Sequence, residues 1–159
     1  MPIKVGDRIP SSRLRVSTPE GPAWKTTEEL FKGKKVALFA VPGAFTPTCS
    51  NQHLPSVVQN ADALRAKGVD VVALTAVNDP MVLGAWQKAN GAEGVDFYSD
   101  GNGEFAKAID LTLDASGGGL GIRSQRYSML VDDGVVKQLN VEQPGKFEVS
   151  SGEAMLKQL

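Results

Sequence analysis

A single cysteine stands where a buried-strand pattern ends and a helix pattern begins. Residues 41–53 read Val-Pro-Gly-Ala-Phe-Thr-Pro-Thr-Cys-Ser-Asn-Gln-His, and Cys49 is the only cysteine among the 159 residues. Thr46 is a favourable helix N-cap and Pro47 suits the first helical position, so Cys49 is predicted to lie in the first helical turn. Unpaired amides and the positive end of the helix dipole favour a thiolate there. The expected chemistry is nucleophilic attack by that thiolate.

Each of these residues also has a plainer interpretation. A lone cysteine is often an inert, buried small side chain, and the spacing of Thr46 is equally consistent with a helix cap alone. His53 lies one helical turn after Cys49, where it is either a general base or, as we favour, a supporting residue that bonds backbone or solvent. Pro55 removes a helical amide and is expected to divide a short cysteine-bearing turn from a longer helix. The strand-to-helix position and the prolines favour a functional thiol.

Alternating strand and helix patterns are expected to position this segment. Short apolar runs predict buried strands at 35–41 and 69–74, and apolar residues at three- and four-residue steps predict a helix from Leu54 that Gly68 closes. The glycine tract at 117–119 is expected to hold no regular element. The other expected elements are a helix from Asp79 to Gly91, a strand at 97–98, a short helix at 104–109, a β-hairpin of 127–131 and 135–140, and a helix at 151–159.

This order predicts an α/β fold with a mixed central β-sheet flanked by helices. Crossover helices make the first strand pairs parallel, whereas the turn at Asp133-Gly134 makes the last pair antiparallel. The pattern is consistent with a thioredoxin-like sheet but does not distinguish it from other small α/β sandwiches. The length predicts a single domain over residues 1–159.

Composition excludes several classes of function. Seventeen basic and 18 acidic side chains leave a net charge of −1 without a basic stripe, so no nucleic-acid partner is expected. The amino terminus has no apolar signal core and no run is long enough to span a membrane, which predicts a soluble, cytoplasmic protein without a membrane partner. One cysteine and one histidine exclude an intramolecular disulfide and an ordinary Cys/His zinc site. No metal or other cofactor is expected.

The cysteine segment resembles a known active-site motif. The residues Pro42-x-x-x-Thr46-x-x-Cys49 are similar to the Pro-x-x-x-Thr-x-x-Cys motif of peroxiredoxins. The longer segment that continues through His53-Leu54-Pro55 resembles their type II, peroxiredoxin-five-like branch. The resemblance covers nearly the whole chain and continues through 75–80, Trp86, 126–129 and 139–142. It implies a thioredoxin fold with an amino-terminal extension. It also implies a thiol peroxidase that reduces hydrogen peroxide and organic hydroperoxides in antioxidant defence.

The resemblance implies a role for each matching residue of the segment. Cys49 would attack the terminal peroxide oxygen and become a sulfenic acid. Thr46 would hold the peroxide through its hydroxyl, while Pro42 would shield the thiolate and shape the pocket. The amides of Thr48 and Cys49 would donate to the peroxide oxygens as charge moves onto the leaving oxygen.

Two further expectations concern an arginine and the reductant. Arg126, directly before Tyr127-Ser128-Met129, corresponds to the family's active-site arginine and would stabilise the thiolate, with the nearby Arg123 as the alternative. Some relatives carry a resolving cysteine near 148–150, but this chain has none. The Cys49 sulfenic acid is therefore expected to be reduced by an external thiol, glutathione with glutaredoxin or thioredoxin.

The family also implies a homodimer formed through loops around the active site. Phe45 and the helix that starts at Pro80 are the candidate contacts, although Met81 and Trp86 are equally consistent with core positions. Two other functional classes fit the residues: a glutaredoxin-like thiol–disulfide oxidoreductase and a non-catalytic interaction module or holdase. A cysteine hydrolase is less favoured, because it would need His53 as a base with an orienting partner.

Overall fold

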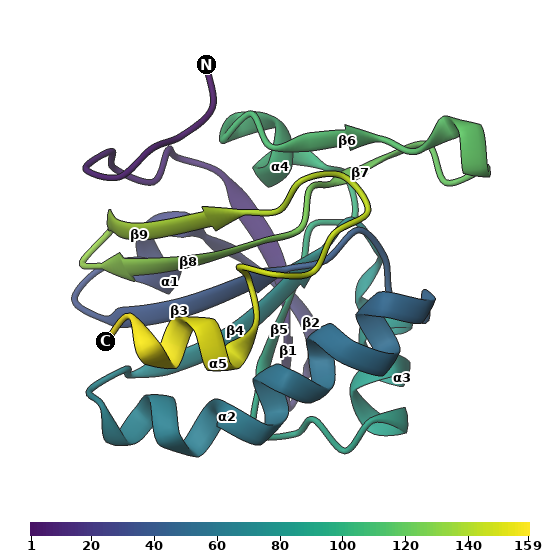
Figure 1. Ribbon diagram of the computed structural model, residues 1–159. Coiled ribbons are helices and arrows are strands. Elements are labelled where there is room, and N and C mark those ends of the chain that lie inside the picture. The colour runs from purple at the N-terminus through teal and green to yellow at the C-terminus, as the bar shows by residue number, and fades with distance from the viewer.

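The computed structural model describes residues 1–159 as a seven-stranded mixed sheet with helices on both faces (Figure 1). The strands lie in the order β2-β1-β5-β4-β3-β8-β9. Their bounds are β1 (Arg13–Thr18), β2 (Gly21–Thr26), β3 (Lys35–Ala40), β4 (Val71–Ala76), β5 (Asp96–Ser99), β8 (Tyr127–Asp132) and β9 (Val135–Val141). Strand β4 runs parallel to both β3 and β5, whereas β8 is antiparallel to β3 and β9. The predicted mixed sheet is confirmed.

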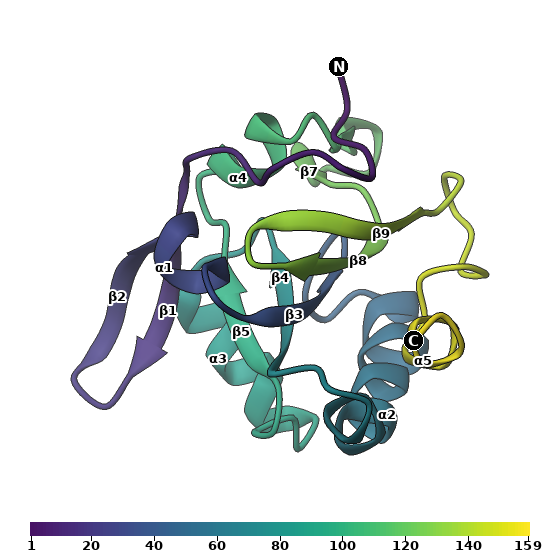
Figure 2. The same cartoon turned by 90° about the vertical axis from the view of Figure 1, so that its left-hand side faces the viewer.

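Helices cover the two faces of the sheet unequally (Figures 1 and 2). Their bounds are α1 (Thr27–Phe31), α2 (Leu54–Ala66), α3 (Pro80–Ala89), α4 (Glu104–Ala108) and α5 (Gly152–Lys157). Helices α2, α3 and α5 supply apolar side chains to one core cluster, and α1, α4 and the amino-terminal segment supply the other. The cysteine-bearing segment lies directly before α2 and therefore on the first of these faces.

The central strands are buried on both sides, which explains their continuous apolar runs. In β3, Ala37 and Phe39 belong to the cluster under α2, α3 and α5. Val36 and Leu38 belong to the opposite cluster. Successive side chains of a strand point to opposite faces, so a strand covered on both faces needs an apolar residue at every position.

The amino-terminal third contains elements that the sequence analysis did not predict. Strands β1 and β2 form a hairpin, β1 pairs antiparallel with β5, and α1 follows directly. Residues of β2 alternate between exposed and half-buried because it is an edge strand. The alternation of apolar residues that would indicate β2 is weak, and Pro22 obscures this pattern further. The capping box of Thr26 and Glu29 at the start of α1 was a usable signal.

The expectation that residues 117–119 hold no regular element was wrong. A 3-10 turn, η2 (Ser116–Gly118), joins β6 (Thr112–Asp114) to β7 (Ile122–Ser124) in a separate two-stranded hairpin. Glycines lack the steric restriction that disfavours left-handed backbone, and Gly119 and Gly121 adopt φ angles of 78° and 70°. They let the chain reverse within a short connection, which projects from the body of the molecule (Figure 1).

The carboxy-terminal predictions are confirmed. Strands β8 and β9 pair through a tight turn in which Asp133 and Gly134 adopt φ angles of 50° and 81°, and α5 closes the chain.

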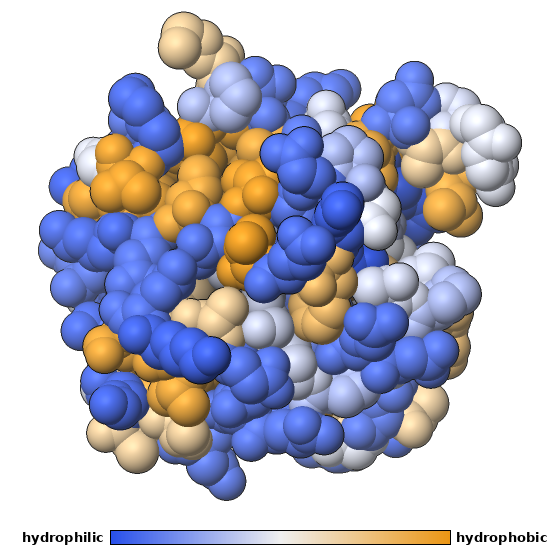
Figure 3. All heavy atoms as spheres, viewed as in Figure 1, coloured by the Kyte–Doolittle hydropathy of each residue, from blue (hydrophilic) through white to orange (hydrophobic).

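No helix combines the length and the apolar character that a membrane span requires. The face in Figure 3 is mostly hydrophilic, with hydrophobic residues gathered mainly over β9 and the amino-terminal segment.

Candidate active site

The loop that leaves β3 is held against the end of β4. The Val41 amide donates to the Thr75 carbonyl at 3.1 Å, and the Ala44 amide donates to Asn78 Oδ1 at 2.9 Å. Phe45 turns the chain with a left-handed φ of 63°. This turn brings the following helix start to the carboxyl ends of the parallel strands, where ligands of open α/β sheets commonly bind.

Cys49 opens a π-helical turn, η1 (Cys49–His53), that runs directly into α2. The Leu54 amide donates to the Cys49 carbonyl, five residues back, and Pro55 without an amide hydrogen follows at once. Residues 47–66 are thus helical throughout. A cysteine-bearing turn is divided from a longer helix, as predicted, but by a change from π-helical to α-helical hydrogen bonding and not by a break. The Cys49 side chain is completely buried.

The amides at the start of this helix are available to a ligand. The Thr48 and Cys49 amides donate to no group of the protein, whereas the Ser50 amide already donates to the Thr46 carbonyl at 2.9 Å. Free amides at a helix start attract negative charge. The two donors predicted from sequence are therefore present beside the Cys49 thiol.

The Thr46 hydroxyl does not cap the helix. Thr46 Oγ1 donates to the Gly43 carbonyl at 2.7 Å, within the loop, and accepts from no helical amide. The cap interpretation is therefore wrong, because the loop turns the hydroxyl back toward Gly43. Since its proton is used by that carbonyl, the oxygen retains lone pairs that can accept a hydrogen bond from a hydroperoxide.

Strand pairing brings Arg126 to Cys49. Ala40, the last residue of β3, lies opposite Tyr127, the first residue of β8, so Arg126 is beside the point where the cysteine loop begins. Arg126 Nη2 donates to Cys49 Sγ at 3.2 Å. Arg123 points elsewhere and donates to the carbonyls of Val77 and Leu120. The geometry thus selects Arg126 over Arg123 as the cationic partner.

His53 supports the arginine and does not contact the thiol as a base. Arg126 Nη1 lies 3.0 Å from His53 Nδ1, and His53 Nε2 lies 2.8 Å from the Ser150 carbonyl. A guanidinium only donates and a carbonyl only accepts, so Nδ1 accepts and Nε2 carries the proton. Burial, followed by the charge of Arg126, lowers the pKa of His53 to about 3. This neutral, fully engaged imidazole excludes the cysteine hydrolase alternative.

Glu142, directly after β9, is a residue of this site that the sequence analysis did not single out. Glu142 Oε2 accepts hydrogen bonds from three successive amides, those of Glu148, Val149 and Ser150, and from Ser150 Oγ. Burial opposes its ionisation, but these hydrogen bonds lower the pKa of Glu142. Its place in the collinear block 139–142 was the only available signal, and that block does not indicate chemistry.

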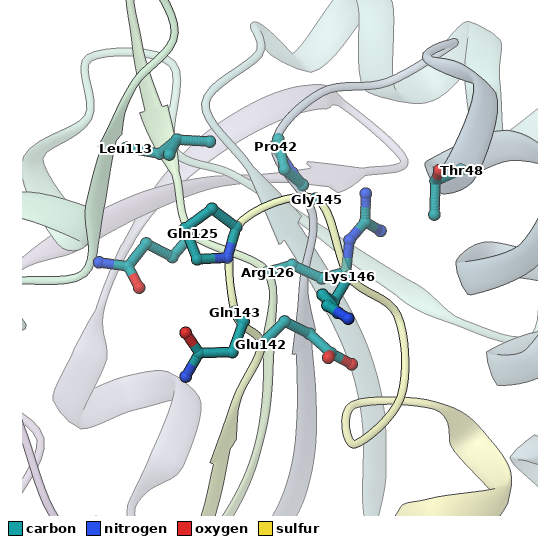
Figure 4. A pocket seen from close by; sticks show the side chains of 10 residues that line it. Pro42, Thr48, Leu113, Gln125, Arg126, Glu142, Gln143, Gly145 and Lys146 are labelled. Carbon is teal, nitrogen blue, oxygen red and sulfur yellow. The ribbon is translucent and has the colours of Figure 1, made fainter.

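A cavity of about 360 Å³ adjoins this arrangement (Figure 4). Three predicted site residues line it: Pro42, Thr48 and Arg126. The other lining residues are Leu113, Gln125, Glu142, Gln143, Pro144, Gly145 and Lys146. The cavity thus leads to the guanidinium that contacts Cys49, while Thr46 stays in the loop wall against Gly43. No group of three or more His, Cys, Asp or Glu side chains is arranged to hold a metal ion.

Comparisons with known proteins point to one family. The Redoxin family model matches residues 4–156. Peroxiredoxin-2E of Arabidopsis thaliana is 51% identical over 99% of this chain and 69% of its own length. Peroxiredoxin-2C of Oryza sativa subsp. japonica is 46% identical over 99% of both chains. The structure of reduced Prx3 of Vibrio vulnificus in complex with hydrogen peroxide has a TM-score of 0.96 at 49% identity, over 98% of each chain.

The chain belongs to the type II branch of the peroxiredoxin family. Its fold is accordingly thioredoxin-like, as predicted. This peroxiredoxin is a thiol peroxidase, and its only thiol is the one that Arg126 contacts. In this peroxiredoxin Trp86 is fully buried and donates to Ser50 Oγ at 2.9 Å, so it is a core residue. Met81 is exposed and is not a core residue.

Proposed function

We propose that this peroxiredoxin reduces hydrogen peroxide and small organic hydroperoxides with Cys49 as the nucleophile. The observation that carries the assignment is the contact of Arg126 Nη2 with Cys49 Sγ at 3.2 Å. A guanidinium cannot lose its proton under physiological conditions, so it stabilises the thiolate at any pH at which the enzyme works. The same group polarises a peroxide that enters the adjoining cavity.

The first half-reaction forms one bond and breaks one. The Cys49 thiolate attacks the terminal peroxide oxygen, the sulfur–oxygen bond forms, and the oxygen–oxygen bond breaks. Sulfur is oxidised to a sulfenic acid, and the leaving oxygen takes a proton and departs as water or an alcohol. The free amides of Thr48 and Cys49 donate to the oxygens as charge shifts, and the Thr46 oxygen accepts the peroxide hydrogen bond.

The second half-reaction needs a thiol from outside the chain, because Cys49 is the only cysteine. We propose glutathione with glutaredoxin as the reductant, with thioredoxin as the alternative. A glutathione thiolate attacks the sulfenic sulfur and water leaves, and a second thiol then cleaves the mixed disulfide and releases the Cys49 thiolate. Since Cys49 is completely buried, the turn that bears it must open to admit such a thiol. The change of hydrogen-bond pattern before Pro55 makes this turn the place to open.

Peroxide consumption with defined reductants tests the proposal. Hydrogen peroxide is supplied with glutathione, glutaredoxin and glutathione reductase, or with thioredoxin and its reductase, and NADPH loss is followed. Turnover with the glutathione system and a single-oxygen mass increase on Cys49 after one equivalent of peroxide are expected. The Cys49→Ser variant is the control and should show neither. Undiminished peroxide consumption by Cys49→Ser would refute the role of Cys49, and turnover with thioredoxin alone would select the alternative reductant.

We also propose that the enzyme forms a homodimer through the apolar side chains around the active site. Phe45, Met81, Leu120 and Ile122 are 56%, 70%, 40% and 53% exposed, respectively. We propose that these exposed side chains form one contact surface, because a continuous apolar patch is typical of an interface. Sedimentation equilibrium at micromolar concentration tests the dimer with Phe45→Ser as the disrupting variant, and a wild-type protein that stays monomeric would exclude it.

A further inference from the structure

We propose that Glu142 is a positioning residue for peroxide reduction, acting on Arg126 through the backbone of 148–150 and the ring of His53. This inference rests on the proposed role of Cys49 as the nucleophile. Glu142 lines the cavity but forms no hydrogen bond with the thiol or with Thr46, and its effect on the thiolate passes through a series of directional hydrogen bonds. This series of hydrogen bonds begins at Glu142, a residue that is only 6% exposed.

The carboxylate organises the segment that follows β9. Glu142 Oε2 accepts from the amides of Glu148 and Val149 at 2.8 Å each, from the Ser150 amide at 2.9 Å and from Ser150 Oγ at 2.7 Å. No lysine or arginine forms an ion pair with it, so these four donors carry its stabilisation. Three consecutive amides and the Ser150 hydroxyl directed at one oxygen hold the backbone up to Ser150, the residue whose carbonyl faces His53.

That carbonyl sets the proton position on the imidazole. The Ser150 carbonyl accepts from His53 Nε2 at 2.8 Å, which leaves Nδ1 as an acceptor 3.0 Å from Arg126 Nη1. A displaced carbonyl would release Nε2, and the tautomer with the proton on Nδ1 would present a donor to the guanidinium, which has no lone pair to receive it. His53 therefore holds Arg126 only while the carbonyl is in place.

Arg126 is held at its main chain and at its guanidinium by the same segment. The Glu142 amide donates to the Arg126 carbonyl at 2.9 Å, and the Glu142 carboxylate acts on the far end of the Arg126 side chain through His53. With Nη1 occupied by the imidazole, Nη2 is directed at Cys49 Sγ at 3.2 Å. Loss of the carboxylate should thus move a cation away from the thiolate without altering any residue in contact with that thiolate.

The outer side of the segment is held independently. The Gly152 amide donates to Ser56 Oγ at 3.1 Å, and Ser56 Oγ donates to the His53 carbonyl at 2.7 Å. Helix α5 therefore remains docked on α2 when the Glu142 carboxylate is removed. This second attachment predicts that Glu142→Gln folds, with its effect confined to the segment 148–150.

The test compares Glu142→Gln with the control variant Glu153→Gln. Glu153 lies in α5, and its exposed carboxylate accepts a hydrogen bond from Asn60, so the control also loses a hydrogen-bonded carboxylate near the carboxy terminus. The chain has one cysteine and one histidine, so thiolate ultraviolet absorbance reports Cys49 alone and imidazole nitrogen NMR reports His53 alone. In Glu142→Gln the Nε2-protonated tautomer should give way to a mixture, the thiolate fraction at neutral pH should fall, and oxidation by hydrogen peroxide should slow by about tenfold. Glu153→Gln should match the wild type in all three.

The outcomes separate this inference from the proposed function. A folded Glu142→Gln protein with an unchanged His53 tautomer and an oxidation rate within about twofold of the wild type would overturn it. Wild-type Cys49 that fails to react with peroxide would refute the proposed function, whereas the NMR signal of His53 would still report the tautomer. If Glu142→Gln fails to fold, Ser150→Ala, which removes one of the four donors, is measured instead. A partial shift of the His53 tautomer supports the inference, and no shift overturns it.

Discussion

Acidification is expected to destabilise the folded protein through His53. Burial and the charge of Arg126 lower the pKa of His53 in the folded state from 6.5 to about 3. Between these values the unfolded chain holds a proton on the imidazole and the folded protein does not, so unfolding takes up a proton. The free energy of unfolding therefore falls as the pH decreases from about 6.5 toward about 3.

The magnitude follows from the width of that window. Each pH unit below 6.5 contributes about 1.4 kcal/mol, so His53 lowers the free energy of unfolding by about 2 kcal/mol at about pH 5. Asp100 opposes this effect, because burial raises its pKa from 3.8 to about 6 and the folded protein takes up a proton there first. By the same arithmetic Asp100 adds about 1.4 kcal/mol at about pH 5, which hides most of the His53 effect in the wild type.

The variant His53→Gln isolates the histidine. Urea unfolding of the wild type and of His53→Gln is compared at about pH 7.5 and about pH 5, and the contribution of Asp100 cancels because both proteins contain it. On acidification the wild type should lose about 2 kcal/mol more free energy of unfolding than His53→Gln loses. A difference that is equal at both pH values, or an imidazole NMR signal that titrates near its ordinary pKa in the folded protein, would refute the reasoning.

Three other predictions concern the thiolate, the core and the opposing carboxyl. Arg126→Met should lower the thiolate fraction of Cys49 and slow its oxidation by about a hundredfold, and stopped-flow kinetics showing an unchanged rate would remove the arginine from the reaction. Gly152→Ala should destabilise the fold by about 2 to 4 kcal/mol in urea, because the added Cβ would overlap the backbone carbonyl of Ser56 in α2. The control Gly84→Ala meets nothing within 4 Å in α3 and should stabilise by about 0.5 to 1 kcal/mol; equal effects would contradict the packing argument. Asp100→Asn should lose about 1.4 kcal/mol more free energy of unfolding than the wild type between about pH 7.5 and about pH 5, because the opposing contribution of Asp100 is removed, and an equal loss in both proteins would assign that contribution to another group.

Local sequence was sufficient for the features that depend on neighbouring residues. Continuous apolar runs predicted β3 and β4 because both faces of these strands are covered. The Asp133-Gly134 pair predicted the last hairpin because both residues adopt left-handed backbone. Pro47 correctly indicated that Cys49 lies in the first helical turn, although Thr46 does not cap that helix, and the single cysteine of the sequence means that the chain has no resolving cysteine.

Tertiary structure decided how the predicted groups meet at that thiol and which of two arginines contacts it. Arg126 and Cys49 are 77 residues apart, and they meet because Ala40 lies opposite Tyr127 in the pairing of β3 with β8. His53 and the Ser150 carbonyl are 97 residues apart, and their contact depends on how the segment after β9 is held by Glu142. Backbone propensity acts over a few neighbouring residues, whereas strand register and the packing of α5 on α2 set contacts between distant ones. The sequence therefore indicated the nucleophile, its arginine and a supporting histidine, whereas the Glu142 carboxylate and the hydrogen bonds that join it to the imidazole and the guanidinium were visible only in the fold.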